Sequence, residues 1–223
     1  MCVCYGGGMK PLGKVKIEWS PEFAYAIGLL VTDGCLSKDG RHMILVSKDR
    51  EMIENFRKCL GLQNSIGFHS SGSGKQNFRI QFGDVNFYSF LVTIGLEPNK
   101  SKILTEIAIP DEYFFDFLRG HHDGDGTFYS YWDPRWRSSF MFYTVFISAS
   151  ERHVLWVREE IFRKLGIKGH ITKGGKTPMY GLKYAKAESL QLLPKMYYNR
   201  DVVCLSRKRE KIEKALAVAR KQL

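Results

Sequence analysis

Two apolar stretches with helical character dominate the hydrophobic pattern of the chain, one over residues 23–32 and the other over residues 115–124. Ser20-Pro21-Glu22 precedes the first stretch and supplies an N-cap, a first-turn proline and an acid for the helix dipole. Pro110-Asp111-Glu112 has the same place before the second stretch. Each stretch ends in an Asp-Gly pair, which contains Asp33 or Asp125. The pattern therefore predicts two helices, each with an aspartate at its C-terminal end.

The elements predicted after each of these helices also match in order. A β-rich stretch ends at residues 44–47 or 145–148, an amphipathic helix ends at Gly61 or Gly166, and a turn leads into a strand at 78–82 or 180–184. Another helix closes each half, so the chain contains two α-β-β-α-β-β-α units whose motif helices are offset by 92 residues. The second unit is nine residues longer between its aspartate and the end of its β-rich stretch. The repeat predicts an α+β fold with pseudo-symmetric halves at 1–97 and 111–223, joined by a linker at 98–110.

Composition narrows the classes of partner. The 223 residues carry 34 basic and 23 acidic side chains, a formal charge of +11, which favours a polyanion such as nucleic acid. No apolar run is long enough to span a membrane, and the first residues lack the pattern of a signal peptide, so we expect an intracellular protein without a membrane partner. Five cysteines, an odd number, argue against a disulfide framework, and the isolated Cys2-x-Cys4 pair argues against zinc.

The two aspartates occupy positions that are unfavourable for stability. A carboxylate at a helix C-terminus faces the negative end of the dipole and costs about 0.3–1 kcal/mol. A single Asp-Gly is a common helix-ending turn, but two in register within a repeat favour a functional explanation. Small residues spaced i, i+4, Gly28 with Thr32 and Gly120 with Gly124, allow two parallel helices to approach closely and bring both acids together. Paired carboxylates beside a phosphate favour Mg²⁺ and a two-metal type of phosphodiester hydrolysis.

Residues 26–34 and 118–126, which end in Asp33-Gly34 and Asp125-Gly126, both resemble the LAGLIDADG motif of homing endonucleases. The resemblance implies a site-specific double-stranded DNA endonuclease whose metal ligands are Asp33 and Asp125, with Thr32 and Gly124 beside them at the metal site. Two motifs in one chain imply a monomer with two saddle-shaped antiparallel sheets in the DNA major groove, and a cut that leaves short 3′ overhangs. Mg²⁺ is the implied metal; we expect Mn²⁺ to substitute for it, and Ca²⁺ to support binding without cleavage.

The chain departs from the motif at two places. Val31 replaces the first acid of the first motif, whereas Asp123 keeps it in the second; that acid is not the family's metal ligand. His121 and His122 stand where the family usually has apolar residues. We expect them to be buried and hydrogen-bonded rather than to bind metal.

Further residues are predicted at the cleavage centre and on the DNA surface. Lys48 and Lys186 are candidate catalytic residues, and Ser47 and Lys183 are candidate DNA contacts near them, although each lysine has the alternative of a solvated surface charge. Alternation with Phe78, Ile80 and Phe82 places Arg79 and Gln81 on one polar face, with side chains suited to guanine and adenine edges. Phosphate contacts are expected from basic residues in loops or at strand ends: Arg41, Lys75, Arg135, Arg137, Lys173 and Lys176.

Two other functions remain open on the same fold. One is an RNA maturase that assists intron splicing, which would make intron RNA a partner. The other is a DNA-binding regulator without catalysis, which the two retained acids disfavour.

Overall fold

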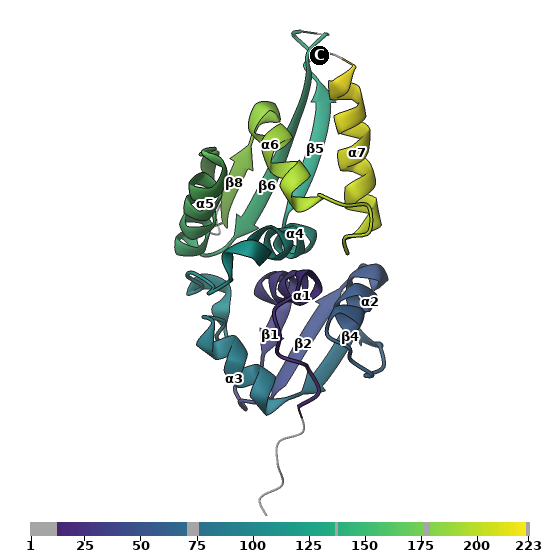
Figure 1. The fold of residues 1–223 in the computed structure, drawn as a ribbon, viewed down its shortest axis with the longest axis vertical. Coiled ribbons are helices and arrows are strands. Elements are labelled where there is room, and N and C mark those ends of the chain that lie inside the picture. Colours follow the sequence, from purple (N-terminus) through teal and green to yellow (C-terminus); the bar gives the residue numbers. More distant parts are fainter. Residues whose placement is uncertain (1–12, 71–75, 137, 176–178, 222–223) are drawn as a thin grey trace, which may run out of the picture.

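A computed structural model of the chain describes residues 13–70, 76–136, 138–175 and 179–221. Within those ranges the elements fall into two halves of the same plan, stacked one above the other (Figure 1). No helix in the described ranges has both the length and the apolar composition needed to cross a bilayer.

The first half has the predicted order of helices and strands. Its elements are α1 (Pro21–Thr32), β1 (Gly34–Leu36), β2 (His42–Ser47), α2 (Arg50–Cys59), β3 (Gly67–Ser70), β4 (Gln76–Gly83) and α3 (Val85–Thr93). The strands form an antiparallel sheet in the order β1-β2-β4-β3. The Ser20 hydroxyl accepts a hydrogen bond from the Phe23 amide at 3.1 Å, so the predicted N-cap starts α1.

The second half repeats this order and adds one helix. Its elements are α4 (Phe114–Gly124), β5 (Thr127–Trp132), β6 (Phe140–Ser148), α5 (Glu151–Leu165), β7 (His170–Gly174), β8 (Met179–Tyr184), α6 (Lys186–Met196) and α7 (Ser206–Arg220). The sheet order, β5-β6-β8-β7, is the counterpart of the first. The α+β fold of two related halves, each with an antiparallel sheet, is therefore confirmed.

Two details differ from the expected pattern. The second motif helix does not begin at Pro110; a 3-10 turn, Asp111–Tyr113, comes first, and α4 starts at Phe114. The segment between the halves is not a simple tether. It contains the 3-10 turn Lys100–Lys102. Its apolar residues Leu104 and Ile107 are buried in the core, so this segment packs against the rest of the protein.

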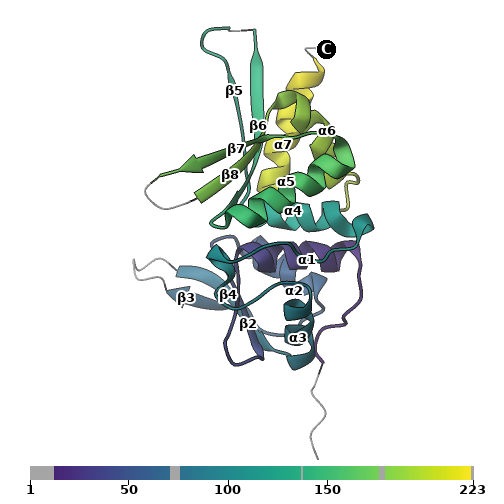
Figure 2. The ribbon, with the colours of Figure 1, turned by 90° about the vertical axis from the view of Figure 1, so that its left-hand side faces the viewer.

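Each sheet has one helix-covered face and one open face. Ile80 and Phe82 of β4 are buried, whereas Arg79 and Gln81 point to the other side. In Figure 2 the helices of both halves lie on one side of the molecule and the strands on the other. The open faces of both sheets are thus available to one extended partner.

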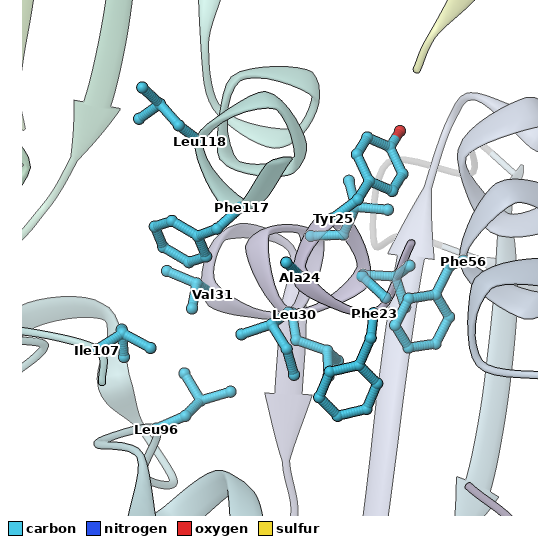
Figure 3. Close-up of a cluster of buried hydrophobic side chains, with 14 of the residues drawn as sticks. Phe23, Ala24, Tyr25, Leu30, Val31, Phe56, Leu96, Ile107, Phe117 and Leu118 are labelled. Atoms are coloured by element: carbon cyan, nitrogen blue, oxygen red, sulfur yellow. The ribbon is translucent and has the colours of Figure 1, made fainter. Parts of the chain in front are cut away.

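The helices α1 and α4 form the junction between the halves, and they lie side by side in both views (Figures 1 and 2). A Cβ atom added at Gly28 would lie 2.7 Å from the His121 amide nitrogen and closer still to the Phe117 carbonyl, and one added at Gly120 would overlap the Tyr25 carbonyl oxygen. Both glycines therefore permit backbone contact that no other residue allows. Figure 3 shows Phe117 and Leu118 of α4 next to α1, whose side chains belong to the same core.

Candidate functional site

The C-terminal ends of α1 and α4 meet, and they bring the two aspartates to one place. Asp33 is the C-cap of α1 and Asp125 is the C-cap of α4. A Cβ added at Gly124 would lie 2.7 Å from Asp33 Oδ2 and would overlap the Thr32 hydroxyl, so the two helix ends touch. Tyr25 lies against Gly120 and Thr32 against Gly124, which makes the helices parallel.

The protonation equilibria of the acids reflect this crowding. Burial, and then repulsion from Asp125, raises the pKa of Asp33 to about 6. Asp125 is exposed at the surface, yet partial desolvation by the residues around it also raises its pKa. The raised pKa of both carboxyls shows that their ionised forms are disfavoured here, and a cation bound next to them would stabilise those forms.

Two lysines that were not among the predicted site residues place positive charge next to the two aspartates. Lys100 and Lys208 are each 7% exposed, and their positive charges lower the pKa of both Asp33 and Asp125. Each lysine caps one motif helix. Lys100 Nζ donates to the carbonyls of Thr32 and Gly34, and Lys208 Nζ donates to the carbonyls of His122, Asp123, Gly124 and Gly126.

The periodicity of α7 contained a signal for Lys208. The positions Leu205, Lys208, Ile212, Ala215 and Ala219 recur every three or four residues, and all five are buried. Lys208 therefore occupies a core position of the helix rather than its solvated face. Burial lowers its pKa to about 8, and Lys100 is shifted in the same direction by the same cause.

A cleft of about 460 Å³ opens beside the acids on the side of the first half. Asp33 and Lys208 line it together with Ser47, Lys48 and Arg207. Ser47 ends β2 and Lys48 follows it. The register pairs Leu45 with Gly34 of β1, so these two residues lie near Asp33. The cleft thus combines two carboxylates, Asp33 and Asp49, with three basic side chains, and one of these, Arg207, is paired with Asp49.

The structure does not bring Lys186 to this centre. Lys183 pairs with Val145, which pairs with Thr127, two residues after Asp125. The strand β8 runs away from the acids beyond that point, and Lys186 begins α6 on the helix-covered side of the sheet. Lys183 itself lies on the open face, with its ammonium 3.9 Å from the centre of the Tyr143 ring.

The expected DNA contacts are distributed over the open faces and their edges. Arg79 donates to the Gln81 side chain, so these two neighbours form one polar unit. Lys173 stacks over Tyr180, Arg135 pairs with Asp133 at 3.4 Å, and Arg41 is exposed in the turn between β1 and β2. Lys75, Arg137 and Lys176 lie outside the described residues.

His121 and His122 are both buried, and neither lines the cleft. His121 Nε2 lies 3.1 Å from His153 Nε2, and His153 Nδ1 lies 2.7 Å from the Thr105 carbonyl oxygen. The His122 ring packs edge-on against Phe146. Burial lowers the pKa of all three imidazoles, so they act as neutral core residues.

The start of α7 connects the two halves beside the cleft. Arg207 Nε lies 3.0 Å from Asp49 Oδ1, and the Ser206 amide donates to Glu51 at 3.0 Å. Both acceptors belong to the first half. On the other side, the Leu205 amide donates to Asp123 of α4 at 2.7 Å.

The buried Asp123 carboxylate is itself a link between the halves. Its Oδ2 atom also accepts a hydrogen bond from the Tyr25 hydroxyl at 2.9 Å, which crosses the α1–α4 contact. Burial raises the pKa of Asp123 to about 6. The first acid of the second motif thus has a structural partner from each half, which explains how it differs in role from Asp125.

The donor set at the helix ends fits a hard divalent cation. In the described ranges, no group of three or more His, Cys, Asp or Glu residues is arranged around a common point. A closed all-protein metal cage is therefore absent from that part of the chain. Two carboxylates at an open cleft suit an ion that completes its shell with water and phosphate oxygens, and Mg²⁺ binds in this way.

We expect Lys208→Met to lower the free energy of unfolding by about 2–3 kcal/mol, because four carbonyls at the end of α4 lose a buried charged donor. It should also raise the pKa of Asp33 further. Urea unfolding measures the first effect. Lys211→Met, at an exposed position on the same helix, is the control and should stay within about 0.5 kcal/mol of the parent. Equal stabilities for the two variants would contradict the capping role.

Comparisons with known proteins concern the fold. No protein-family model matches the chain, and no curated protein sequence matches it. The I-LtrWI LAGLIDADG homing endonuclease bound to target DNA is similar with a TM-score of 0.60 and 10% identity, over 91% of each chain. Meganuclease I-SmaMI bound to uncleaveable DNA is similar with a TM-score of 0.59 and 13% identity, over 94% of this chain and 92% of that one.

The full-length DUF199/WhiA protein from Thermatoga maritima has the same architecture, with a TM-score of 0.59 and 14% identity. The match covers 93% of this chain and 63% of WhiA, so this chain spans less than two thirds of that protein's length. At such identities each likeness shows a shared fold.

Proposed function

We propose that this chain, which has the two-half LAGLIDADG fold, is a monomeric, divalent-metal-dependent endonuclease that cuts both strands of a specific DNA duplex. The observation that carries the proposal is the meeting of Asp33 and Asp125 at the ends of two parallel helices, beside a cleft lined by Lys48 and Lys208. The fold neighbours bound to DNA and the charge of +11 support the same partner.

The proposed roles follow from position. Asp33 and Asp125 would hold Mg²⁺, with the backbone around Thr32 and Gly124 fixing how far apart the two carboxylates stand. When bound there, the cation supplies Lewis-acid charge next to the scissile phosphate. The charges of Lys100 and Lys208 lower the pKa of both carboxyls and so favour their ionised forms, and the two lysines hold the helix ends in place. Lys48 faces the same cleft and is positioned to bind a phosphate oxygen.

The open sheet faces would bind the flanking duplex. Arg79 and Gln81 lie on the open face of the first sheet, where a bidentate contact to guanine or adenine edges in the major groove fits their chemistry. The basic residues Arg41, Arg135 and Lys173 lie toward the edges of the faces, which suits phosphate contacts. Because the halves differ in sequence, the preferred site should lack strict palindromy.

Similarity to solved structures at 10–14% identity shows the fold and does not establish cleavage. The acids favour an enzyme over a protein that only binds DNA or intron RNA. Two desolvated carboxylates that repel each other lower stability and provide no attraction for a polyanion. A cation between them would reverse both effects, and a binding protein without catalysis has no need of that arrangement.

The direct test is incubation of the purified chain with a plasmid pool that carries randomised 25-base-pair inserts. With Mg²⁺ we expect linearisation at one asymmetric sequence, with short 3′ overhangs and one chain per duplex by light scattering. Mn²⁺ should substitute, and Ca²⁺ should support binding without cutting. Binding to a defined site with no cleavage in either Mg²⁺ or Mn²⁺ would instead identify a DNA-binding protein without nuclease activity.

The pH dependence of cleavage should be bell-shaped. Metal binding requires ionised Asp33, so the rate should fall as the pH drops below its pKa of about 6. The positive charge of Lys208 is lost as the pH rises through about 8, so the rate should fall again above that value. Single-turnover rates at subsaturating Mg²⁺ between pH 5 and 9.5 measure both limbs. A flat profile over this range would exclude these assignments.

A further inference from the structure

The open face of the second sheet carries three tyrosines that stand parallel to one another. Tyr129 and Tyr131 come from β5, and Tyr143 comes from β6, directly opposite Tyr129 in the register. The ring centroids of Tyr129 and Tyr143 lie 5.2 Å apart, those of Tyr131 and Tyr143 lie 6.2 Å apart, and the interplanar angles are 28° and 18°. We call these three residues the tyrosine ladder.

Strand alternation fixes which way the tyrosine ladder faces. Phe128 and Phe142, the neighbours of Tyr129 and Tyr143, are buried in a core that includes Leu193 of α6 and Ile212 of α7. The tyrosines therefore point away from the helices. This is the same open side of the molecule on which the first sheet presents Arg79 and Gln81.

Lys183 and a hydroxyl contact hold the ladder together. Lys183 Nζ lies 3.9 Å from the Tyr143 centroid and 5.3 Å from the Tyr129 centroid. A hydrogen bond with the Tyr131 side chain, and then burial, raise the pKa of the Tyr143 hydroxyl. The rings are thus ordered before any partner binds, which reduces the entropy lost on binding.

The contacts within the ladder cover part of the ring faces. Within the ladder each ring turns a face toward another ring, and Lys183 covers part of Tyr143. Unpaired bases bind aromatic side chains by stacking on free ring faces, so the ladder is poorly suited to single-stranded nucleic acid. Tyr129 and Tyr131 are 38% and 41% exposed as whole residues, and the outer edges of their rings suit a duplex groove.

The two open faces therefore differ in the bases that they can recognise. Arg79 and Gln81 form the paired donors and acceptors that distinguish guanine and adenine. Ring edges present C–H groups and one hydroxyl each, and they form no bidentate pair. The base that offers a matching apolar group in the major groove is thymine, through its C5-methyl.

We propose that the tyrosine ladder makes the second half of the chain a reader of thymine-rich duplex, through contacts between tyrosine ring edges and thymine methyl groups. This inference rests on the proposed function, because it assumes that the open faces lie in a DNA major groove. The two ends of one asymmetric site would then be recognised differently. The first half would hydrogen-bond to purines at one end, and the second half would contact thymine methyl groups at the other.

The test begins with selection of binding sequences from a randomised duplex pool in Ca²⁺. We expect one end of the recovered site to be enriched in thymine. Replacing those thymines by deoxyuridine removes only the methyl groups and should weaken binding about three- to fivefold per position. The same replacement at thymines of the opposite end should change affinity less than twofold.

Protein variants assign each end to a half. Tyr129→Ala combined with Tyr131→Ala should abolish both the thymine preference and the sensitivity to deoxyuridine. Arg79→Ala is the matched control. It should weaken the base preference at the opposite end of the site and leave the sensitivity to deoxyuridine intact. A duplex whose affinity is unchanged by deoxyuridine, or a thymine preference that persists in the double variant, overturns the inference while leaving the endonuclease proposal standing.

Two further outcomes are informative. Tighter binding to single strands of the selected sequence, whether DNA or RNA, than to the duplex would replace the groove contact by base stacking and overturn the inference. Failure to enrich any sequence from the pool would remove site-specific DNA binding altogether, and the inference with it.

Discussion

Asp33→Asn and Asp125→Asn are each expected to reduce double-strand cleavage by at least about a thousandfold while leaving DNA affinity within a fewfold of the parent. Either substitution removes one of the two carboxylates that meet at the helix ends and with it a charge that a divalent cation needs. A bound metal contributes several kcal/mol to transition-state stabilisation, which corresponds to this loss in rate. Plasmid linearisation with Mg²⁺ and gel-shift titration with Ca²⁺ separate the two effects.

The same substitution at position 33 should make the protein more stable. The folded-state pKa of Asp33, about 6, lies above the ordinary value of 3.8, so the folded protein favours the protonated acid. Protonated Asp33 therefore stabilises the folded state below about pH 4, and this contribution to the free energy of unfolding is lost as the pH rises through about 6. At pH 7.5 without metal, Asp33→Asn should therefore raise the free energy of unfolding by about 1–2 kcal/mol, after allowance for solvent screening.

The stability difference should also shrink toward zero at pH 4, where the aspartate is largely protonated and resembles asparagine. Chemical unfolding in EDTA at the two pH values measures it. Asp39→Asn, in an exposed turn where a hydrogen bond from His42 lowers the pKa of the carboxyl to about 2, is the control with the opposite sign. A loss of stability in Asp33→Asn at pH 7.5 would mean that the carboxylate is paired rather than desolvated.

Replacing either junction glycine by alanine should have the largest effect on stability. Helix propensity alone predicts that Gly→Ala within a helix stabilises by about 1 kcal/mol. At Gly28 and Gly120, however, the added methyl would collide with backbone of the opposite helix, which cannot move like a flexible side chain. We therefore expect a loss of about 3 kcal/mol or more, and separation of the two aspartates.

Thermal unfolding of Gly120→Ala and Gly28→Ala measures this loss, and Mg²⁺-dependent cleavage reports on the spacing of the acids. Gly67→Ala is the matched control, because a Cβ at Gly67 meets nothing within 4 Å. Propensity and packing predict opposite signs at the junction, so a raised melting temperature in either junction variant would show that α1 and α4 do not pack as described.

Local signals in the sequence were sufficient for the plan of the molecule. The helix start at Ser20, the paired Asp-Gly ends and the repeated order of apolar stretches predict both halves, because duplication repeats the same short-range rules. The start of the second motif helix was predicted less accurately. Pro110 and Asp111 carry the same cues as Ser20 and Pro21, but Pro110 has no side-chain oxygen to accept a capping hydrogen bond, and a 3-10 turn forms instead.

The candidate site was harder to complete from sequence, and the lysines show why. Lys48 and Lys186 are predicted at the cleavage centre because each comes after a strand, yet only Lys48 lies in the cleft with Asp33. Lys208 lies within a run of five charged residues that resembles a solvated helix face, and Lys100 lies in a segment that resembles a linker. The spacing of apolar residues in α7 places Lys208 on the buried face of that helix, but its approach to Asp33, like that of Lys100, depends on packing between elements far apart in the chain. Short-range patterns do not encode that packing.

Because Lys208 lies in α7, the candidate site can be completed only late in synthesis of the chain. The two aspartates and both sheets precede residue 200, but the lysine that caps α4 and the arginine that joins Asp49 come after it. A ribosome that has released only the earlier residues carries a chain with its acids in place and its cleft unfinished. The order of residues along the polypeptide thus delays assembly of the candidate cutting centre until α7 has been made.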